Sequence, residues 1–124
     1  TGSYLLLYRA VYNLVENAIK YNHPGGKVTV NIQQKKSLLN AAVSPAPADC
    51  AFIEVSDTGI GISPEYQEKI FTPFFRIDKS RSRAMGGAGL GLALVNEIAR
   101  QHGGEVKVLK SDKNGSTIAL ILPL

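Results

Sequence analysis

Near the start of the chain, amide, ammonium and phenol side chains share one side of a predicted helix. Apolar residues recur at helical spacing from Tyr4 to Tyr21. Beside that apolar stripe, at i, i+4, i+7 and i+8, stand Asn13, Asn17, Lys20 and Tyr21. This face could simply be the hydrated side of the helix, but two asparagines lower helix propensity, which favours a functional role. An asparagine carbonyl is a hard, neutral oxygen donor suited to Mg²⁺.

Asp57 ends a predicted strand and shares the alternation of the apolar residues before it, so its side chain is expected on the buried side. The carboxylate could cap the turn that follows it, a common use of aspartate. However, Gly59 and Gly61 alternate with Ile60 and Ile62, which would line a pocket for a flat base. An acidic acceptor in such a pocket would bond the amino group of adenine and reject the carbonyl of guanine.

The glycine-rich run at residues 86–92, GGAGLGL, leads directly into a predicted helix. Backbone amides at a helix N-terminus form an anion site. Taken alone, the run also fits a flexible hinge. It matches neither the dinucleotide fingerprint nor the phosphate-loop pattern, because no strand leads into it and no Gly-Lys-Ser/Thr follows.

Four basic residues and one aspartate give residues 76–83 a net charge of +3. Such a cluster is either a solvated face or a site for phosphate or nucleic acid. No aromatic residue lies between Arg76 and Arg83, which argues against single-stranded nucleic acid. We therefore interpret the cluster as facing phosphate.

The elements that must position these residues follow from periodicity and from turn residues. In chain order we predict a helix at 4–21, strands at 28–32 and 53–57 joined by a long loop at 35–49, a short helix at 63–71, a lid at 72–87, a helix from about 90 to 102, and two strands around 106–108 and 118–122 with a turn at 112–115. The predicted fold class is α+β: a two-layer α/β sandwich whose mixed, mostly antiparallel sheet is covered on one face by three helices.

The bulk composition indicates a single globular domain over residues 1–124, because the chain has 124 residues, of which 44% are hydrophobic and 19% charged. No apolar run approaches the ~18 residues that a membrane-spanning helix needs, and the first residues lack the pattern of a secretory signal. A single cysteine, Cys50, excludes an internal disulfide and, with only two histidines, a zinc cluster.

Four segments, taken in order, resemble the asparagine, first glycine, phenylalanine and second glycine boxes of sensor histidine kinases. They are residues 13–21 (NLVENAIKY), 57–61 (DTGIG), 71–76 (FTPFFR) and 87–92 (GAGLGL). The similarity extends to Gln101-His102-Gly103-Gly104 and to the closing Ile121-Leu122-Pro123. It implies the Bergerat ATP-binding fold of the GHKL superfamily, shared with type II topoisomerases, mismatch-repair ATPases and a chaperone family.

The resemblance implies a nucleotide site for ATP and Mg²⁺. Asn17 would ligate the metal with Asn13 supporting it, Lys20 would contact phosphate, and Tyr21 would lie beside the nucleotide. Asp57 would hold the adenine amino group. The other implied cofactor-binding positions are Gly59, Gly61 and Ile62 around the base, and Gly87, Gly89, Leu90, Gly91 and Leu92 around the phosphates. Ala88 departs from the threonine or serine more common in the family, and the 35–49 loop is longer than expected.

The implied chemistry is phosphoryl transfer rather than hydrolysis. Hydrolytic relatives carry a glutamate four residues before the metal asparagine, whereas this chain has Asn13 there, and an amide cannot take a proton. Glu16 is turned about 100° around the helix from Asn17, so it suits the orientation of an incoming histidine better than the activation of water. Arg76 is expected at the γ-phosphate. Asn13, Glu16, Lys20 and Arg76 are thus the implied catalytic residues.

The expected activity is that of a protein-histidine kinase in two-component signal transduction. A histidine on a separate dimerisation domain, docked near Phe74, would accept the phosphoryl group and pass it to a response regulator. His23 and His102 are expected to be structural, so the chain alone is not expected to phosphorylate itself. We expect a monomer that binds no nucleic acid and lies in the cytoplasm, alone or as part of a membrane-bound sensor. The alternatives are a non-catalytic nucleotide-binding switch, an ATP-hydrolysing clamp or a serine-directed kinase.

Overall fold

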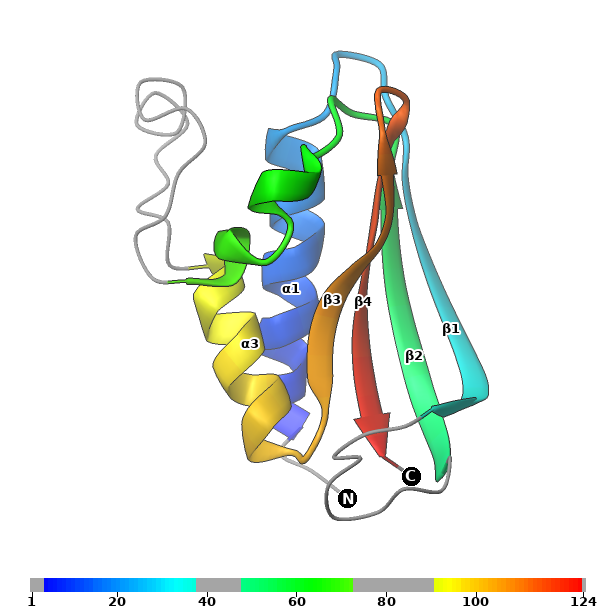
Figure 1. Ribbon diagram of the computed structural model, residues 1–124, viewed down its shortest axis with the longest axis vertical. Coiled ribbons are helices and arrows are strands. Elements are labelled where there is room, and N and C mark those ends of the chain that lie inside the picture. Colours follow the sequence, from blue (N-terminus) through cyan, green and yellow to red (C-terminus); the bar gives the residue numbers. More distant parts are fainter. Residues whose placement is uncertain (1–3, 38–47, 73–90, 124) are drawn as a thin grey trace.

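Two helices pack against one face of a four-stranded sheet in the computed structural model, which describes residues 4–37, 48–72 and 91–123 (Figure 1). The helices are α1 (Tyr4–Lys20) and α3 (Gly91–Gln101). Two short 3-10 turns, η1 (Pro64–Tyr66) and η2 (Lys69–Phe71), lie between them in sequence. The predicted α+β sandwich is therefore confirmed. No helix in the described ranges is long and apolar enough to cross a membrane.

The sheet contains β1 (Val28–Ser37), β2 (Ala48–Asp57), β3 (Glu105–Asp112) and β4 (Gly115–Pro123). The strand order is β1-β2-β4-β3, and each of these neighbours pairs antiparallel. We predicted a mixed, mostly antiparallel sheet, and the pairings that the structure describes are all antiparallel. The predicted turn at 112–115 joins β3 to β4, and the Asn114 backbone N–H donates to Asp112 Oδ1 at 2.8 Å.

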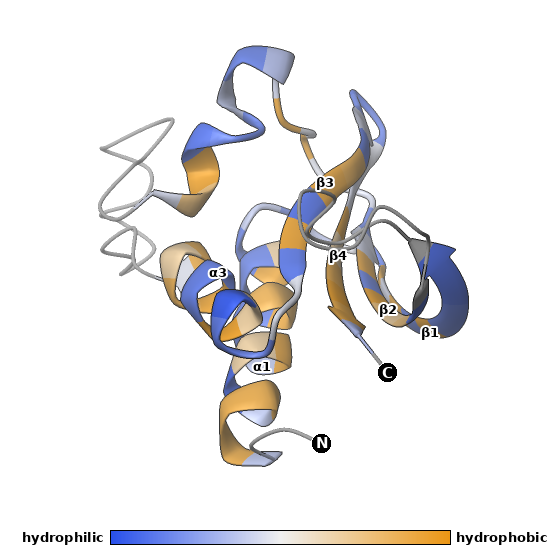
Figure 2. Ribbon diagram, turned by 60° about the horizontal axis from the view of Figure 1, so that its bottom comes forward, coloured by the Kyte–Doolittle hydropathy of each residue, from blue (hydrophilic) through white to orange (hydrophobic). Residues whose placement is uncertain are grey.

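The main core fills the space between the two layers. The buried residues of α1 are Ala10, Leu14 and Ala18, which recur every four residues and so face the sheet together. They pack with the buried residues of α3 and of the strands: Val95, Ile98, Ala99, Val55, Val106, Ile118 and Leu120. Polar and apolar residues alternate along β3 from Glu105 to Val108, as expected for a strand with one buried face (Figure 2). Burial of these side chains is the main force that fixes α1 on the sheet.

A second apolar cluster lies on the sheet face opposite the helices. It consists of Cys50, Phe52, Ala119 and Ile121, which alternate along β2 and β4 with residues of the main core. Next to it, the Lys35 ammonium lies 5.0 Å from the centre of the Phe52 ring and 3.0 Å from Glu54 Oε2.

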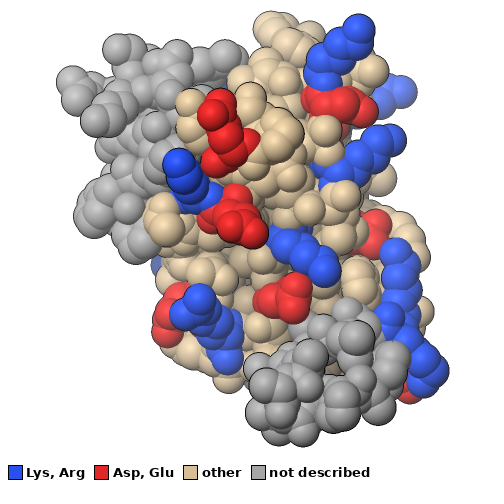
Figure 3. Space-filling view, in the orientation of Figure 1, with Lys and Arg blue, Asp and Glu red and all other residues tan. Residues whose placement is uncertain are grey.

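Basic and acidic side chains lie side by side on the face shown in Figure 3. Exposed ion pairs of this kind contribute little to stability.

One predicted boundary was wrong, and one predicted helix has a different form. Residues 35–49 were predicted as a loop, but β1 continues to Ser37 and β2 begins at Ala48, so that Lys35 pairs with Cys50 and Lys36 with Asp49. In this extension, Lys36 Nζ lies 3.1 Å from Asp49 Oδ1, and such a cross-strand pair of opposite charges favours the strand pairing. The helix predicted at 63–71 takes the form of the two 3-10 turns, and Ser63 makes no side-chain cap.

Candidate functional site

The polar face of α1 lies beside the beginning of α3. Asn13 and Asn17 are half-buried, and neither side-chain amide hydrogen-bonds to another described residue. A methyl group placed on Gly91, the first residue of α3, would lie 3.8 Å from Asn13 Oδ1. The structure thus brings Asn13 and Gly91, which are far apart in sequence, to one place. Leu92 follows Gly91 and packs against the main core.

Lys20 forms an ion pair with Glu16 one turn earlier on α1. The distance from Lys20 Nζ to Glu16 Oε1 is 3.4 Å, and both side chains are partly exposed, at 28% and 43%. Pairs with this spacing on a helix contribute only about 0.3–0.5 kcal/mol. Lys20 can therefore exchange this partner for a stronger anion at small cost.

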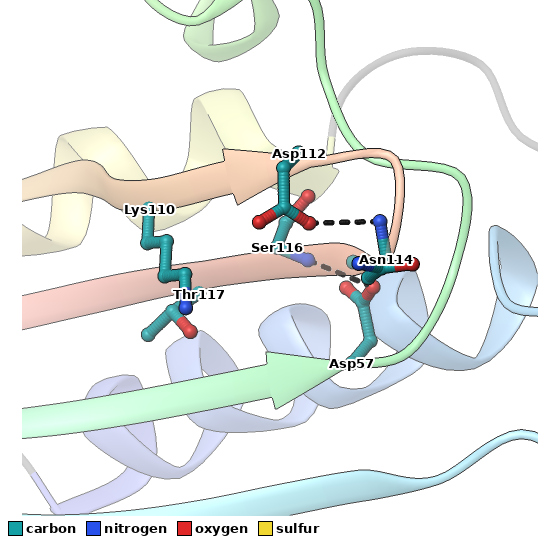
Figure 4. Close-up of a pocket in the computed structure, with 7 residues that line it drawn as sticks. Asp57, Lys110, Asp112, Asn114, Ser116 and Thr117 are labelled. Carbon is teal, nitrogen blue, oxygen red and sulfur yellow. Dashed lines mark hydrogen bonds between the residues drawn. The ribbon is translucent and has the colours of Figure 1, made fainter.

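Asp57 both caps a turn and retains an unused acceptor. Its Oδ1 accepts hydrogen bonds from the backbone N–H groups of Gly59 at 2.9 Å and Ser116 at 3.2 Å, while Oδ2 has no hydrogen-bond partner among the described residues. The side chain points from the end of β2 toward the β3–β4 turn (Figure 4). The turn-capping interpretation therefore holds, and it leaves one oxygen of the carboxylate available to a ligand.

Gly59 and Gly61 are required by close backbone contacts on opposite sides. A methyl group on Gly59 would lie 2.3 Å from the Tyr21 carbonyl oxygen, and one on Gly61 would lie 2.0 Å from the Asp112 carbonyl oxygen. Gly61 also has a φ of +78°, a conformation that glycine adopts without strain. The loop after Asp57 therefore packs between the end of α1 and the β3–β4 turn. The segment carrying Tyr21 and the segment carrying Asp57 are thereby brought together.

A polar network that the sequence analysis missed joins the end of α1 to the same loop. Asn22 Oδ1 accepts from the Thr58 hydroxyl at 3.1 Å, and Asn22 Nδ2 donates to the Lys27 carbonyl at 2.8 Å. The Thr58 hydroxyl in turn accepts from the Lys27 backbone N–H at 2.9 Å. Asn22 directly follows Tyr21, and Thr58 directly follows Asp57. This adjacency to two candidate residues is the only sequence signal that could have pointed to Asn22 and Thr58.

The β3–β4 turn and Asp57 enclose a small polar hollow of about 180 Å³ (Figure 4). Its lining residues are Asp57, Lys110, Asp112, Asn114, Gly115, Ser116 and Thr117. Apart from Asp57, none of these was a candidate site residue, since the sequence pattern indicated only strands and a turn. Nearby, Ser111 Oγ accepts a hydrogen bond from the Ile62 backbone N–H at 2.6 Å. The hairpin is thus a wall of the candidate site.

Several predicted positions lie outside the described residues: Phe74, Arg76, Gly87, Ala88, Gly89 and Leu90. Of the two histidines, His23 is exposed in the turn after α1. His102 follows α3, and its Nδ1 lies 2.8 Å from the Ile98 carbonyl oxygen. Neither position is on the polar face of α1.

This combination of a polar helix face, an aspartate-glycine loop and an antiparallel sheet defines a class of ATP-binding domain. The chain matches, over residues 2–124, the model of the "Histidine kinase-, DNA gyrase B-, and HSP90-like ATPase" family, and it belongs to that family. The family resemblance inferred from the sequence is confirmed.

Within the family, the chain is similar to sensor histidine kinases. It is 43% identical over 122 residues to the sensor-like histidine kinase SenX3 of Mycobacterium tuberculosis, which covers 98% of this chain and 27% of SenX3. The sensor histidine kinase RppB of Synechocystis is 39% identical over 123 residues, 99% of this chain and 24% of RppB. The structure of the mycobacterial sensor histidine kinase MprB superposes with a TM-score of 0.76 and 32% identity, covering 98% of this chain and 72% of that one. The chain spans about a quarter of the length of the curated relatives.

Proposed function

We propose that this chain binds Mg·ATP and presents the γ-phosphoryl group to a histidine on a dimerisation domain, as the catalytic domain of a protein-histidine kinase. The observation that supports this most directly is Asp57, whose Oδ1 is committed to the fold while Oδ2 has no partner among the described residues. The side-chain amides of Asn13 and Asn17 on α1, which have no hydrogen-bond partner among the described residues, would add a second group of ligand-binding atoms. The other steps of the proposal build on these two groups.

Base recognition is assigned to Asp57 and the glycine loop. Asp57 Oδ2 would accept a hydrogen bond from the exocyclic amino group of adenine, whereas the carbonyl of guanine would face the carboxylate without a proton to share. Gly59 and Gly61 allow the loop to pack without side chains between the end of α1 and the hairpin. Ile62 would supply an apolar wall beside the base, and Tyr21 would lie along the nucleotide.

Metal and phosphate binding are assigned to the polar face of α1. The described ranges contain no group of three His, Cys, Asp or Glu side chains that could hold a metal ion together. The donors that we assign on α1 are amide oxygens. They fit Mg²⁺, which takes few protein ligands and keeps water and phosphate oxygens. Asn17 would ligate it with Asn13 in support, and bound Mg²⁺ would neutralise phosphate charge. Lys20 would leave Glu16 for a phosphate oxygen.

The phosphate end of the site would be completed by the second glycine box and by Arg76. Gly91 lies beside Asn13 at the N-terminus of α3, where backbone amides favour anions. Gly87, Gly89 and Leu90 would form the phosphate-binding segment before that helix, and Leu92 would follow it in the first turn of α3.

The chemistry would await an imidazole nucleophile. Asn13 cannot act as a general base, because an amide does not accept a proton. Hydrolysis should therefore be slow, and a histidine placed in line with the γ-phosphate would be the acceptor. Glu16 would orient that histidine once Lys20 has moved to phosphate, and Arg76 would stabilise the transferred group. The partner domain would dock near Phe74, a response regulator would receive the phosphoryl group, and the expected compartment is the cytoplasm.

The test is a calorimetric titration of a non-hydrolysable ATP analogue, with and without Mg²⁺, into the chain and into Asp57→Asn. The matched control is Asp49→Asn, the same change at the other end of β2. We expect tight, Mg²⁺-dependent binding that Asp57→Asn abolishes and Asp49→Asn leaves unchanged, and no binding of a GTP analogue. A folded chain that binds neither analogue would refute the proposal. Rapid ATP turnover by the chain alone would instead favour the hydrolysing clamp.

A further inference from the structure

Ser111, near the end of β3, contacts the loop at residues 58–62, the base-pocket loop, although it is 49 residues from Ile62 in sequence. We propose that Ser111 is a positioning residue, whose hydroxyl holds the Ile62 side of the loop against the β3–β4 hairpin and so sets the width of the base pocket. This inference rests on the proposed nucleotide site and extends it to a residue that would not touch the nucleotide.

The hydrogen bonds around Ser111 form a continuous path between two walls of the pocket. Ser111 Oγ accepts from the Ile62 N–H at 2.6 Å and lies 3.0 Å from Ser116 Oγ. Ser116 is only 6% exposed, and its backbone N–H donates to Asp57 Oδ1 at 3.2 Å. Ser111 therefore links the loop that carries the apolar wall to the residue that holds the adenine-binding carboxylate.

The loop has different anchors on its two sides. On the α1 side, the backbone N–H groups of Thr58 and Ile60 donate to the carbonyls of Lys27 and Tyr21, at 3.2 and 3.4 Å. These backbone bonds do not involve the hairpin. On the hairpin side, the described hydrogen bond to the loop is the one from Ile62 to the Ser111 hydroxyl. Loss of that hydroxyl would release one side of the loop and leave the other in place.

The surroundings make this bond difficult to replace. The Ile62 N–H is partly buried, so water cannot freely take the place of the hydroxyl, and an unsatisfied buried donor is unfavourable. The Ile62 carbonyl is separately held by Gln67 Nε2 at 3.0 Å. Gly61 packs directly on the Asp112 carbonyl. Without Ser111 Oγ, the loop would move away from the hairpin while Asp57 kept its bonds to Gly59 and Ser116.

The test compares Ser111→Ala with Ser111→Thr, which keeps the hydroxyl, and with Ser56→Ala. Ser56 is a matched control, because its hydroxyl also pairs with a hydroxyl across the sheet, Thr117 Oγ1 at 2.8 Å, but makes no described bond to the loop. Three quantities are measured for each variant: affinity for the ATP analogue, amide hydrogen exchange at Ile62 without nucleotide, and melting temperature.

We expect Ser111→Ala to weaken analogue binding roughly five- to tenfold, the size expected when one hydrogen bond that holds a binding loop is lost. Ile62 should exchange faster in that variant, while Ser111→Thr and Ser56→Ala stay near wild type. Unchanged affinity in Ser111→Ala, or an equal loss in Ser56→Ala, would overturn the inference. If the unmodified chain bound no analogue, the proposed function would fail and the pocket role of Ser111 with it. If binding were lost in Asp57→Asn but unaffected in Ser111→Ala, only the role of Ser111 would fail.

Discussion

Replacing Gly61 with alanine tests the contact between the base-pocket loop and the hairpin most severely. Gly61 has a φ of +78°, and a Cβ there would lie 2.0 Å from the Asp112 carbonyl oxygen. Gly25 is a close control, because its φ is +79° but a Cβ there would meet nothing within 4 Å. The two substitutions share the backbone strain and differ in the steric clash.

The expected magnitudes follow from that difference. The positive φ alone costs alanine about 1–2 kcal/mol, which is the loss of unfolding free energy expected for Gly25→Ala. At Gly61 the carbonyl is about 1.3 Å closer than the ~3.3 Å of a short carbon–oxygen contact, so the hairpin must shift. Overpacking of this kind adds about 1–3 kcal/mol, for a total of about 2–5 kcal/mol. Domains of this size have about 5–15 kcal/mol of stability, so the variant should still fold.

Urea unfolding followed by far-ultraviolet circular dichroism measures both losses, and titration with the ATP analogue shows whether the shifted hairpin also weakens binding. We expect weaker binding in Gly61→Ala and unchanged binding in Gly25→Ala. Equal losses of stability in the two variants would refute the reasoning, because the close contact with Asp112 would then carry no cost.

Further predictions concern α1. Leu14 is only 1% exposed, so Leu14→Ala should lower the free energy of unfolding by about 2–5 kcal/mol. Ile19 is 62% exposed, so Ile19→Ala should change that free energy by less than about 0.5 kcal/mol. Urea unfolding measures both. Lys20→Met should leave stability within about 0.5 kcal/mol but weaken ATP-analogue binding about tenfold or more by calorimetry; unchanged affinity would remove Lys20 from the site. Glu16→Gln should preserve analogue affinity yet slow phosphoryl transfer to a supplied histidine domain, measured with radiolabelled ATP, and an unchanged rate would exclude its orienting role.

The elements with strong local patterns were predictable. The buried stripe of α1, the turn at 112–115 and the place of Asp57 at the end of β2 all follow from periodicity and from turn residues close in sequence. The full length of β1 did not follow, because Lys35 and Lys36 are polar and show no alternation. They are strand residues because they pair with β2, where Glu54 and Asp49 supply opposite charges. Such pairing depends on residues 13 and 19 positions away.

The residues that we propose to bind the ligand stand out in the sequence, whereas the residues that support them do not. Asn17 and Asp57 stand out by residue type and by position in a local pattern. Asn22, Thr58 and Ser111 have no such pattern, and their roles arise from hydrogen bonds between segments 31 to 49 residues apart. These bonds form only when α1, the loop and the hairpin come together. It is therefore easier to identify from a sequence pattern the residues that would contact a ligand than the residues that position them.

The hydrogen bonds of Asp57 also determine which substitution can test its proposed role. One carboxylate oxygen accepts two backbone hydrogen bonds, so removal of the whole side chain would leave two N–H groups unsatisfied and disturb the fold together with the site. An asparagine side chain keeps a carbonyl oxygen for those two donors and replaces only the free oxygen with an amino group. That amino group would face the amino group of adenine, donor against donor. Asp57→Asn therefore separates loss of base recognition from loss of structure, and Asp57→Ala does not.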